Sequence, residues 1–200
     1  MRLFLALNLP QELRERIHEA GSRLRDAGYP LRWTPSEEYH ITLKFMGNVA
    51  ASLKPALRHA AGQVARRTAP LRVELGGFGA FPTIRRPRVL WLGAVPSPAL
   101  RCLRQDLEWV LSERGFEREA RTFHPHVTLG RASEKEGAGA FRGLDELAAG
   151  LHFSASFEPE GLDLMRSHLS AKGARYTVID RYPFVGETAG DGEDDGASSA

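Results

Sequence analysis

Apolar residues along this chain of 200 residues recur with two different periods, one helical and one extended. A period of three to four residues predicts a helix that begins after Pro10 and ends at Gly28. The same period predicts helices over residues 52–67 and 98–114, and a short helix is predicted over residues 141–148. The apolar stripes of the longer helices are expected to pack against a sheet.

Short apolar or alternating runs, typical of β-strands, fill the intervals between these helices. They cover residues 3–9, 31–33, 39–45, 71–75, 88–95, 125–129, 151–157, 162–169 and 175–179. The segment between the strands 71–75 and 88–95 is rich in Gly, Phe and Pro and is expected to be a loop. Helices and strands alternate on both sides of a midpoint near Pro96. We therefore predict an α+β fold over residues 1–186, with two pseudo-symmetric lobes, each a sheet covered by helices, around a central cleft.

One polar pattern interrupts an apolar run twice, once in each half of the chain. Residues 39–43 read Tyr-His-Ile-Thr-Leu, and residues 125–129 read Pro-His-Val-Thr-Leu. A spacing of two residues places a histidine and a threonine on the same face of an extended strand. One such strand is usually a half-buried polar face. Two copies predict two polar faces that meet in the cleft between the lobes.

Strand alternation assigns the residues of the first motif to two faces. His40, Thr42 and Lys44 share the polar face that is expected to line the cleft. Ile41, Leu43 and Phe45 fall on the opposite face, which is expected to pack against helices. The first strand therefore offers one imidazole, one hydroxyl and one ammonium group to the cleft.

The second motif presents a similar polar face. His126 and Thr128 share this face with Gly130. Arg131 has the wrong parity for a regular strand, but a bulge or a strand end at Gly130 would turn its guanidinium inward. The two strands together would then enclose two imidazoles, two hydroxyls and a guanidinium.

The charge of the chain is uneven along its length. The formal net charge is +2, but residues 187–200 contain five acidic residues and no Lys or Arg. Without these five, 20 of the 25 acidic residues remain against 27 Lys and Arg, which gives the body a charge of +7. We predict that residues 187–200 form a disordered acidic tail, because they lack apolar residues to bury. A basic body suits a polyanionic ligand, although an arginine-rich mixed surface explains it equally well.

Two facing imidazoles suit a reaction in which one proton is removed and another is delivered near neutral pH. Phosphodiester cleavage is such a reaction. A neutral histidine takes a proton from the attacking hydroxyl or water, and a protonated histidine gives one to the leaving oxygen. Threonine hydroxyls and an Arg or Lys would hold the non-bridging oxygens. We expect neither a metal nor another cofactor, because these groups suffice.

The chain resembles a known family, the two-histidine phosphoesterases, and within it the bacterial and archaeal RNA 2′,3′-cyclic phosphodiesterases, also called 2′-5′ RNA ligases. The resemblance lies in five segments and extends over nearly everything except the acidic tail. These segments are residues 2–7 (RLFLAL), 39–47 (YHITLKFMG), 77–82 (GFGAFP), 87–93 (PRVLWLG) and 123–131 (FHPHVTLGR). The paired histidine motifs at this separation are the specific part of the pattern.

The resemblance places the family's motif histidines at His40 and His126, its motif threonines at Thr42 and Thr128, and its phosphate-binding arginine at Arg131. It implies hydrolysis of a 2′,3′-cyclic phosphate at an RNA end to a 2′-phosphate. His126 would be the general base that activates water, and His40 the general acid that protonates O3′. The symmetry of the two motifs leaves an exchange of these roles open.

The resemblance also implies a reverse reaction. A 5′-hydroxyl RNA end in place of water would join two ends through a 2′-5′ linkage without a nucleotide cofactor. The sequence contains neither a P-loop nor a nucleotidyl-transfer lysine motif that would indicate ATP-dependent joining. The expected partner is RNA with a 2′,3′-cyclic phosphate end.

Three further residues are candidate substrate contacts. Lys44 shares the polar face of the first strand, although a lysine at a strand end is commonly solvated. Phe45 belongs to a group of aromatic residues that stack on a nucleobase or simply fill the core. His124 lies two residues before His126, but Pro125 disturbs the alternation, so a rim or supporting position is expected.

Two other function classes stay open on the sequence. A metal-dependent hydrolase or a cupin-like metal protein would use His124, His126 and a third histidine as ligands. Chelator sensitivity would identify that class. A non-catalytic module that binds RNA ends would show no hydrolysis, and its His40→Ala and His126→Ala variants would retain RNA binding.

The remaining features restrict location and assembly. The apolar run over residues 3–9 is too short to span a bilayer and lacks a signal-peptide cleavage pattern, so we expect a cytoplasmic protein without a membrane partner. The single cysteine, Cys102, cannot form an internal disulfide. No coiled coil or long apolar surface is evident, and we expect a monomer.

Overall fold

The computed structural model describes residues 1–133, 135–137, 139–170 and 173–186. The predicted acidic tail, residues 187–200, lies outside the described residues. The strands are β1 (Arg2–Asn8), β2 (Leu31–Trp33), β3 (His40–Asn48), β4 (Val73–Thr83), β5 (Arg86–Ala94), β6 (His126–Ala132), β7 (Ser154–Phe157), β8 (Gly161–Ser170) and β9 (Gly173–Pro183). The helices are α1 (Gln11–Ala20), α2 (Ser22–Asp26), α3 (Lys54–Arg67), α4 (Pro98–Ser112) and α5 (Leu144–Ala149), with 3-10 turns η1 (Ser36–Glu38) and η2 (Ala51–Leu53).

The described strands form one continuous antiparallel sheet. Its order is β7-β4-β5-β6-β3-β1-β8-β9, and β2 pairs with β6 beside this path. The two motif strands, β3 and β6, are neighbours at its centre, where Ile41 lies opposite Val127. The α+β class is thus confirmed, but the prediction of one separate sheet for each lobe is wrong.

The two halves of this sheet do not correspond to the two halves of the chain. β3 and β1 lie beside β8 and β9, while β6 lies beside β5, β4 and β7. Each half therefore combines strands from before and after Pro96, which corrects the expected division at that residue. Periodicity identifies strands but not their partners, and the long-range pairing of β1 with β8 has no local signal.

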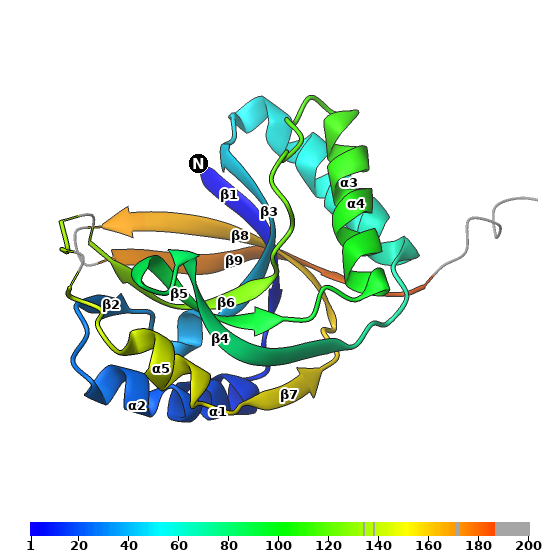
Figure 1. Cartoon of the computed structure of the whole chain (residues 1–200). Helices are drawn as coiled ribbons and strands as arrows, with labels where there is room; N and C mark the ends of the chain where they lie inside the picture. Colours follow the sequence, from blue (N-terminus) through cyan, green and yellow to red (C-terminus); the bar gives the residue numbers. More distant parts are fainter. Residues whose placement is uncertain (134, 138, 171–172, 187–200) are drawn as a thin grey trace, which may run out of the picture.

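Helices pack on the sheet in two groups (Figure 1). α3 and α4 lie side by side and cover the half that contains β3, β8 and β9. α1, α2 and α5 gather at the other end of the molecule near β4. Within the described residues no helix is long and apolar enough to cross a membrane.

β1 has a buried residue at every position from Leu3 to Leu7. Leu3, Leu5 and Leu7 belong to the main core, whereas Phe4 and Ala6 form a smaller cluster with Met165. Both faces of this central strand are covered, which explains why its sequence is a continuous apolar run rather than an alternating one.

The segment predicted as a loop between residues 75 and 88 is mostly strand. β4 continues to Thr83 and pairs with β5 along most of its length. Gly79 lies opposite Trp91, and an added Cβ there would come within 2.8 Å of the indole Cζ3 and closer still to Cζ2 and Cη2. Gly79 therefore marks a close approach of the Trp91 indole to the backbone, not a turn.

Candidate active site

A β-bulge in β3 decides which side chains of the first motif reach the cleft. Ala6 lies opposite Thr42 and Leu5 opposite Lys44, so Leu43 is an extra residue in β3. The bulge reverses the alternation beyond Leu43. Lys44 is only 3% exposed and points to the helix-covered side, whereas Phe45 is 46% exposed and lines the cleft. Both face assignments from regular alternation, Lys44 in the cleft and Phe45 in the core, are wrong.

β6 contains the matching bulge. Thr128 lies opposite Trp91 and Gly130 opposite Leu90, so Leu129 is the extra residue. Arg131 consequently lines the same cavity as the motif residues. It occupies the position in the second motif that Phe45 occupies in the first, five residues after the histidine. The bulge expected near Gly130 is present, one residue earlier.

The two motif strands line one cavity of about 150 Å³. Both motif histidines and both motif threonines contribute to its wall, as the two polar faces were expected to do. The lining residues are Phe4, Thr34, Glu38, His40, Thr42, Phe45, His126, Thr128, Arg131 and Tyr176.

Each imidazole is oriented by a backbone carbonyl two residues before it. His40 Nδ1 lies 2.8 Å from the carbonyl oxygen of Glu38, and His126 Nδ1 lies 2.7 Å from that of His124. A carbonyl only accepts, so Nδ1 must carry the proton in both rings. In the neutral state Nε2 is then the unprotonated nitrogen of each ring, the form required of a general base.

The environment favours the neutral form of both histidines. Burial lowers the pKa of His40 to about 4, and the positive charges of His126 and Arg131 act in the same direction, against the Glu38 carbonyl. Burial also lowers the pKa of His126, with Arg131 and His124 adding to the effect. Without a ligand, both rings are therefore uncharged at neutral pH.

Aromatic rings hold His40 in place. The ring centroid of Phe4 lies 5.0 Å from that of His40, and Tyr176 meets the imidazole edge-on at 4.9 Å. Glu38 is almost fully buried and accepts a hydrogen bond of 2.9 Å from the backbone N–H of Tyr176. This bond connects β9 to the turn before β3, and burial raises the pKa of the Glu38 carboxyl.

Sequence reasoning did not single out Phe4, Thr34, Glu38 or Tyr176. Phe4 is read as part of an apolar strand, and Tyr176 belongs to a strand 136 positions away from His40. Glu38 has no local signal either, because its burial and its hydrogen bond to β9 are visible only in the fold.

His126 is enclosed in a similar way by β4 and β5. The rings of Phe81 and Trp91 lie 5.1 and 6.3 Å from the imidazole, measured between centroids. His124 packs its ring edge-on against Phe81 at 6.0 Å, and its carbonyl orients His126. His124 does not line the cavity, so it holds the supporting position expected of it rather than that of a substrate contact.

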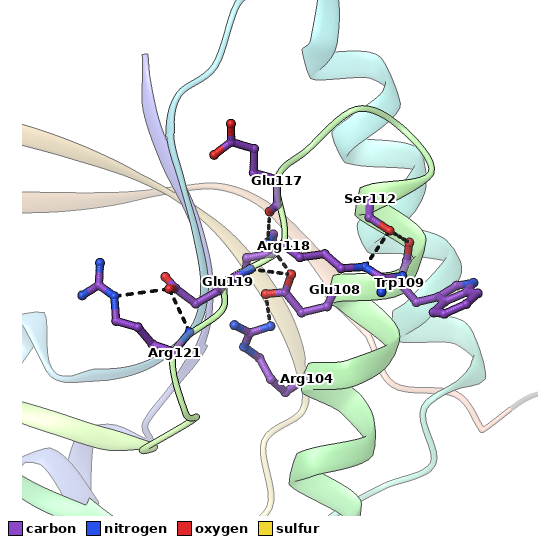
Figure 2. A network of polar contacts seen from close by, with 9 residues as sticks. Arg104, Glu108, Trp109, Ser112, Glu117, Arg118, Glu119 and Arg121 are labelled. Carbon is purple, nitrogen blue, oxygen red and sulfur yellow. Dashed lines mark hydrogen bonds and ion pairs between the residues drawn. The ribbon is translucent and has the colours of Figure 1, made fainter.

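Lys44 belongs to a buried polar network behind β3. Its ammonium group donates to Glu108 Oε2 at 2.6 Å and to the backbone carbonyl of Glu117 at 2.7 Å. Figure 2 shows Glu108 on α4 between Arg104 and the backbone of Glu119, whose N–H donates to the same carboxylate at 3.2 Å. The network fastens the segment that precedes β6 to α4 and to the bulge of β3. Lys44 is therefore a structural residue.

The described side chains offer no group of three or more His, Cys, Asp or Glu arranged to hold a metal ion. His124 and His126 lie close in sequence, but the ring of His124 packs edge-on against Phe81 and does not line the cavity that His126 lines. The cavity instead combines two acid–base groups with hydroxyl and guanidinium donors, a set suited to an anionic phosphorus centre.

Comparisons with known proteins identify relatives over most of the chain. The family model of the 2′-5′ RNA ligase superfamily matches residues 9–171. The RNA 2′,3′-cyclic phosphodiesterase of Thermus thermophilus is 34% identical over 195 residues, which cover 94% of this chain and 92% of that protein. The protein of the same name from Aeropyrum pernix is 33% identical over 167 residues, covering 79% and 91%.

Solved structures agree with these relationships. The crystal structure of a Thermus thermophilus protein has a TM-score of 0.79 and 28% identity, covering 94% of this chain and all of the other. E. coli LigT complexed with 3′-AMP has a TM-score of 0.73 and 29% identity, covering 92% and 97%. The chain belongs to the 2′-5′ RNA ligase superfamily of two-histidine phosphoesterases and is homologous to RNA 2′,3′-cyclic phosphodiesterases over most of its length.

Proposed function

We propose that this protein hydrolyses a 2′,3′-cyclic phosphate at an RNA end to a 2′-phosphate and a free 3′-hydroxyl. The observation that carries the proposal is the pair of imidazoles in one cavity, each with Nδ1 bound to a carbonyl and Nε2 left for acid–base work. The relatives named RNA 2′,3′-cyclic phosphodiesterase support the choice of substrate.

In the proposed mechanism the two rings act on opposite sides of phosphorus. His126 Nε2 takes a proton from water as the water oxygen forms its bond to phosphorus. The bond between phosphorus and O3′ breaks, and His40 Nε2 gives its proton to O3′. His126 ends protonated and His40 neutral, so proton exchange with solvent restores the starting state.

Binding of the substrate favours the protonated form of His40. Both imidazoles are neutral in the free protein, because burial lowers their pKa values. An anionic cyclic phosphate in the cavity favours an imidazolium beside it and raises the pKa of the ring. Thr42, Thr128 and Arg131 would hold the non-bridging oxygens, whose charge grows during the attack.

The same site also supports 2′-5′ joining of RNA ends as a second activity. A 5′-hydroxyl RNA end in the position of the water would attack a cyclic phosphate and form a 2′-5′ linkage. The acid and base roles are unchanged, because the nucleophile is again an O–H group. No nucleotide cofactor is needed, because the strained cyclic ester is the activated group.

The proposal is tested with an RNA oligonucleotide that ends in a 2′,3′-cyclic phosphate, in excess chelator. We expect wild type to form a 2′-phosphate, identified by chromatographic comparison with authentic oligonucleotides that end in a 2′-phosphate or a 3′-phosphate. The His40→Ala and His126→Ala variants are each expected to lower kcat by about 10²- to 10⁴-fold, the usual contribution of one acid–base group. An intact end with wild type contradicts the proposal, and activity restored by added metal would favour a metal hydrolase.

A further inference from the structure

A second cavity of about 210 Å³ adjoins the active site. It lies between β2, the residues that follow β2, and the start of β9. Thr34, Arg131 and Tyr176 line both cavities, so the two are separated by no more than these side chains. A ligand that extends beyond the active site on this side enters the second cavity.

The second cavity is positively charged. Arg32, Arg131 and Arg175 contribute to its wall, and its described lining contains no Asp or Glu. Arg175 forms an ion pair of 3.7 Å with Glu38. Arg32 and Arg131 form neither an ion pair nor a side-chain hydrogen bond with any residue in the described part of the chain.

The sheet places these two arginines directly opposite each other. In the β2–β6 pair, Arg32 lies across from Arg131. Like charges at directly opposed positions destabilise a strand pair. The register is nevertheless fixed, because the N–H of Thr34 donates to the carbonyl of Leu129, the bulge residue, at 2.8 Å. The fold therefore brings both arginines to one cavity whose described lining contains no carboxylate.

The head of Arg32 points toward β9. A Cβ added at Gly173 would lie 3.6 Å from Arg32 Nε and 3.7 Å from its Cζ. Gly173 itself lines the second cavity. The guanidinium thus lies at the wall between β2 and β9, with Arg131 reaching the same space from β6.

We propose that Arg32, together with Arg131, forms a second phosphate subsite, which binds the phosphodiester on the 5′ side of the terminal nucleotide. Arg131 lines both cavities and contacts both phosphates. This inference rests on the proposed function, which places the terminal cyclic phosphate in the first cavity. A phosphate between the two guanidiniums removes their repulsion and accepts charge-assisted hydrogen bonds from both. Arg32 is then a specificity residue that distinguishes an RNA end from a mononucleoside cyclic phosphate.

The experiment compares three substrates: a mononucleoside 2′,3′-cyclic phosphate, a dinucleotide with the same cyclic end, and that dinucleotide with an uncharged methylphosphonate at its internal linkage. For wild type we expect kcat/KM to be about tenfold or more higher for the charged dinucleotide, the effect of one charge-assisted contact. Arg32→Gln should lose this advantage, while its kcat/KM on the other two substrates stays within about twofold of wild type.

The control is Arg67→Gln, which removes the same charge from the exposed last turn of α3. It should keep the full preference for the charged dinucleotide. The proposal is overturned if Arg32→Gln retains the preference, or if it loses activity equally on all three substrates. The melting temperature gives a second readout. Arg32→Gln removes one member of a repulsive pair, so the melting temperature of this variant should equal or exceed that of wild type. A fall of several degrees would indicate a structural role instead.

A binding measurement separates this inference from the proposed function. The dinucleotide and mononucleotide that carry a 2′-phosphate are titrated into wild type and Arg32→Gln. A dinucleotide affinity that depends on Arg32, in a protein that fails to open any cyclic phosphate, would support the subsite and refute the proposed function. Equal affinities for the two ligands in wild type would refute the subsite whatever the activity.

Discussion

The chemistry of the site depends on how single residues are held. His40 and His126 each donate a hydrogen bond from Nδ1 to the backbone carbonyl two positions earlier, at 2.8 and 2.7 Å. Such bonds fix both the tautomer and the plane of the ring. The His-x-Thr pattern was enough to predict the pair. It could not predict the aromatic neighbours Phe4, Tyr176, Phe81 and Trp91, since these come from distant strands.

The neutral state of both rings predicts different pH dependences for the free and the bound enzyme. His40 must be protonated to act as the acid, and its pKa of about 4 makes that form scarce as the pH rises above 4. Bound phosphate raises this pKa. The pH dependence of kcat/KM reports the free enzyme, and that of kcat reports the enzyme with bound substrate. As the pH rises, kcat/KM should therefore reach half its maximum at least about one pH unit below the pH at which kcat does. Coincident profiles would show that the ligand does not protonate His40.

Gly79 predicts a residue-scale effect at the other imidazole. An alanine there meets the indole of Trp91, which borders His126. We expect Gly79→Ala to lower the free energy of unfolding by about 1–3 kcal/mol, the usual cost of overpacking, and to lower kcat. Chemical denaturation measures the first effect.

A second substitution tests the cause of this loss. In a Trp91→Leu background the smaller side chain leaves room for the new methyl group, so Gly79→Ala should cost much less. Gly137→Ala is the matched control, because an added Cβ at Gly137 contacts nothing within 4 Å. Equal losses with and without Trp91 would contradict the steric explanation.

At the scale of elements, two β-bulges shape the site. Leu43 in β3 and Leu129 in β6 are the extra residues, and each reverses the alternation after its motif. Regular alternation therefore predicted Lys44 and Phe45 on the wrong faces. The sequence contains a hint of the second bulge in Gly130, but the first bulge has no glycine beside it and could not be located from local sequence.

The buried position of Lys44 predicts that its substitution lowers the stability of the protein and not its affinity for the substrate. Lys44→Met removes a buried partner of Glu108 and leaves the Glu117 carbonyl without its donor. We expect the free energy of unfolding to fall by about 2–4 kcal/mol, as for other broken buried ion pairs. KM for the cyclic phosphate should stay within about twofold of wild type.

The exposed Lys135 provides the control for this experiment. Lys135→Met removes the same charge from a surface position, and its free energy of unfolding should change by less than about 0.5 kcal/mol. A Lys44→Met variant with unchanged stability and a raised KM would instead make Lys44 a substrate contact.

At the scale of the whole molecule, the chain is interleaved. β1 pairs with β8, β4 pairs with β7, and β5 pairs with β6. The α+β class and nearly every element were predictable from periodicity, because they depend on local patterns. The single sheet was not, since strand pairing between Leu3 and Arg166 is decided by the collapse of the whole chain.

This topology predicts that the chain folds as one unit. A fragment of residues 1–96 lacks the partners of β1 on one side, and a fragment of residues 97–186 lacks those of β6 and β7. Neither fragment should show a cooperative transition in thermal or chemical denaturation followed by circular dichroism, and the full chain should show one. A fragment that unfolds cooperatively would indicate two independent lobes.

The central claim, that His40 and His126 act as acid and base, is tested most directly with a sulfur leaving group. The substrate is a 2′,3′-cyclic phosphate in which sulfur replaces O3′, so that the leaving thiolate needs no proton. We predict that His40→Ala cleaves this substrate within about tenfold of the wild-type rate, while His126→Ala stays impaired by about 10²-fold or more. Equal impairment of both variants would contradict the account, and rescue of His126→Ala alone would reverse the two roles.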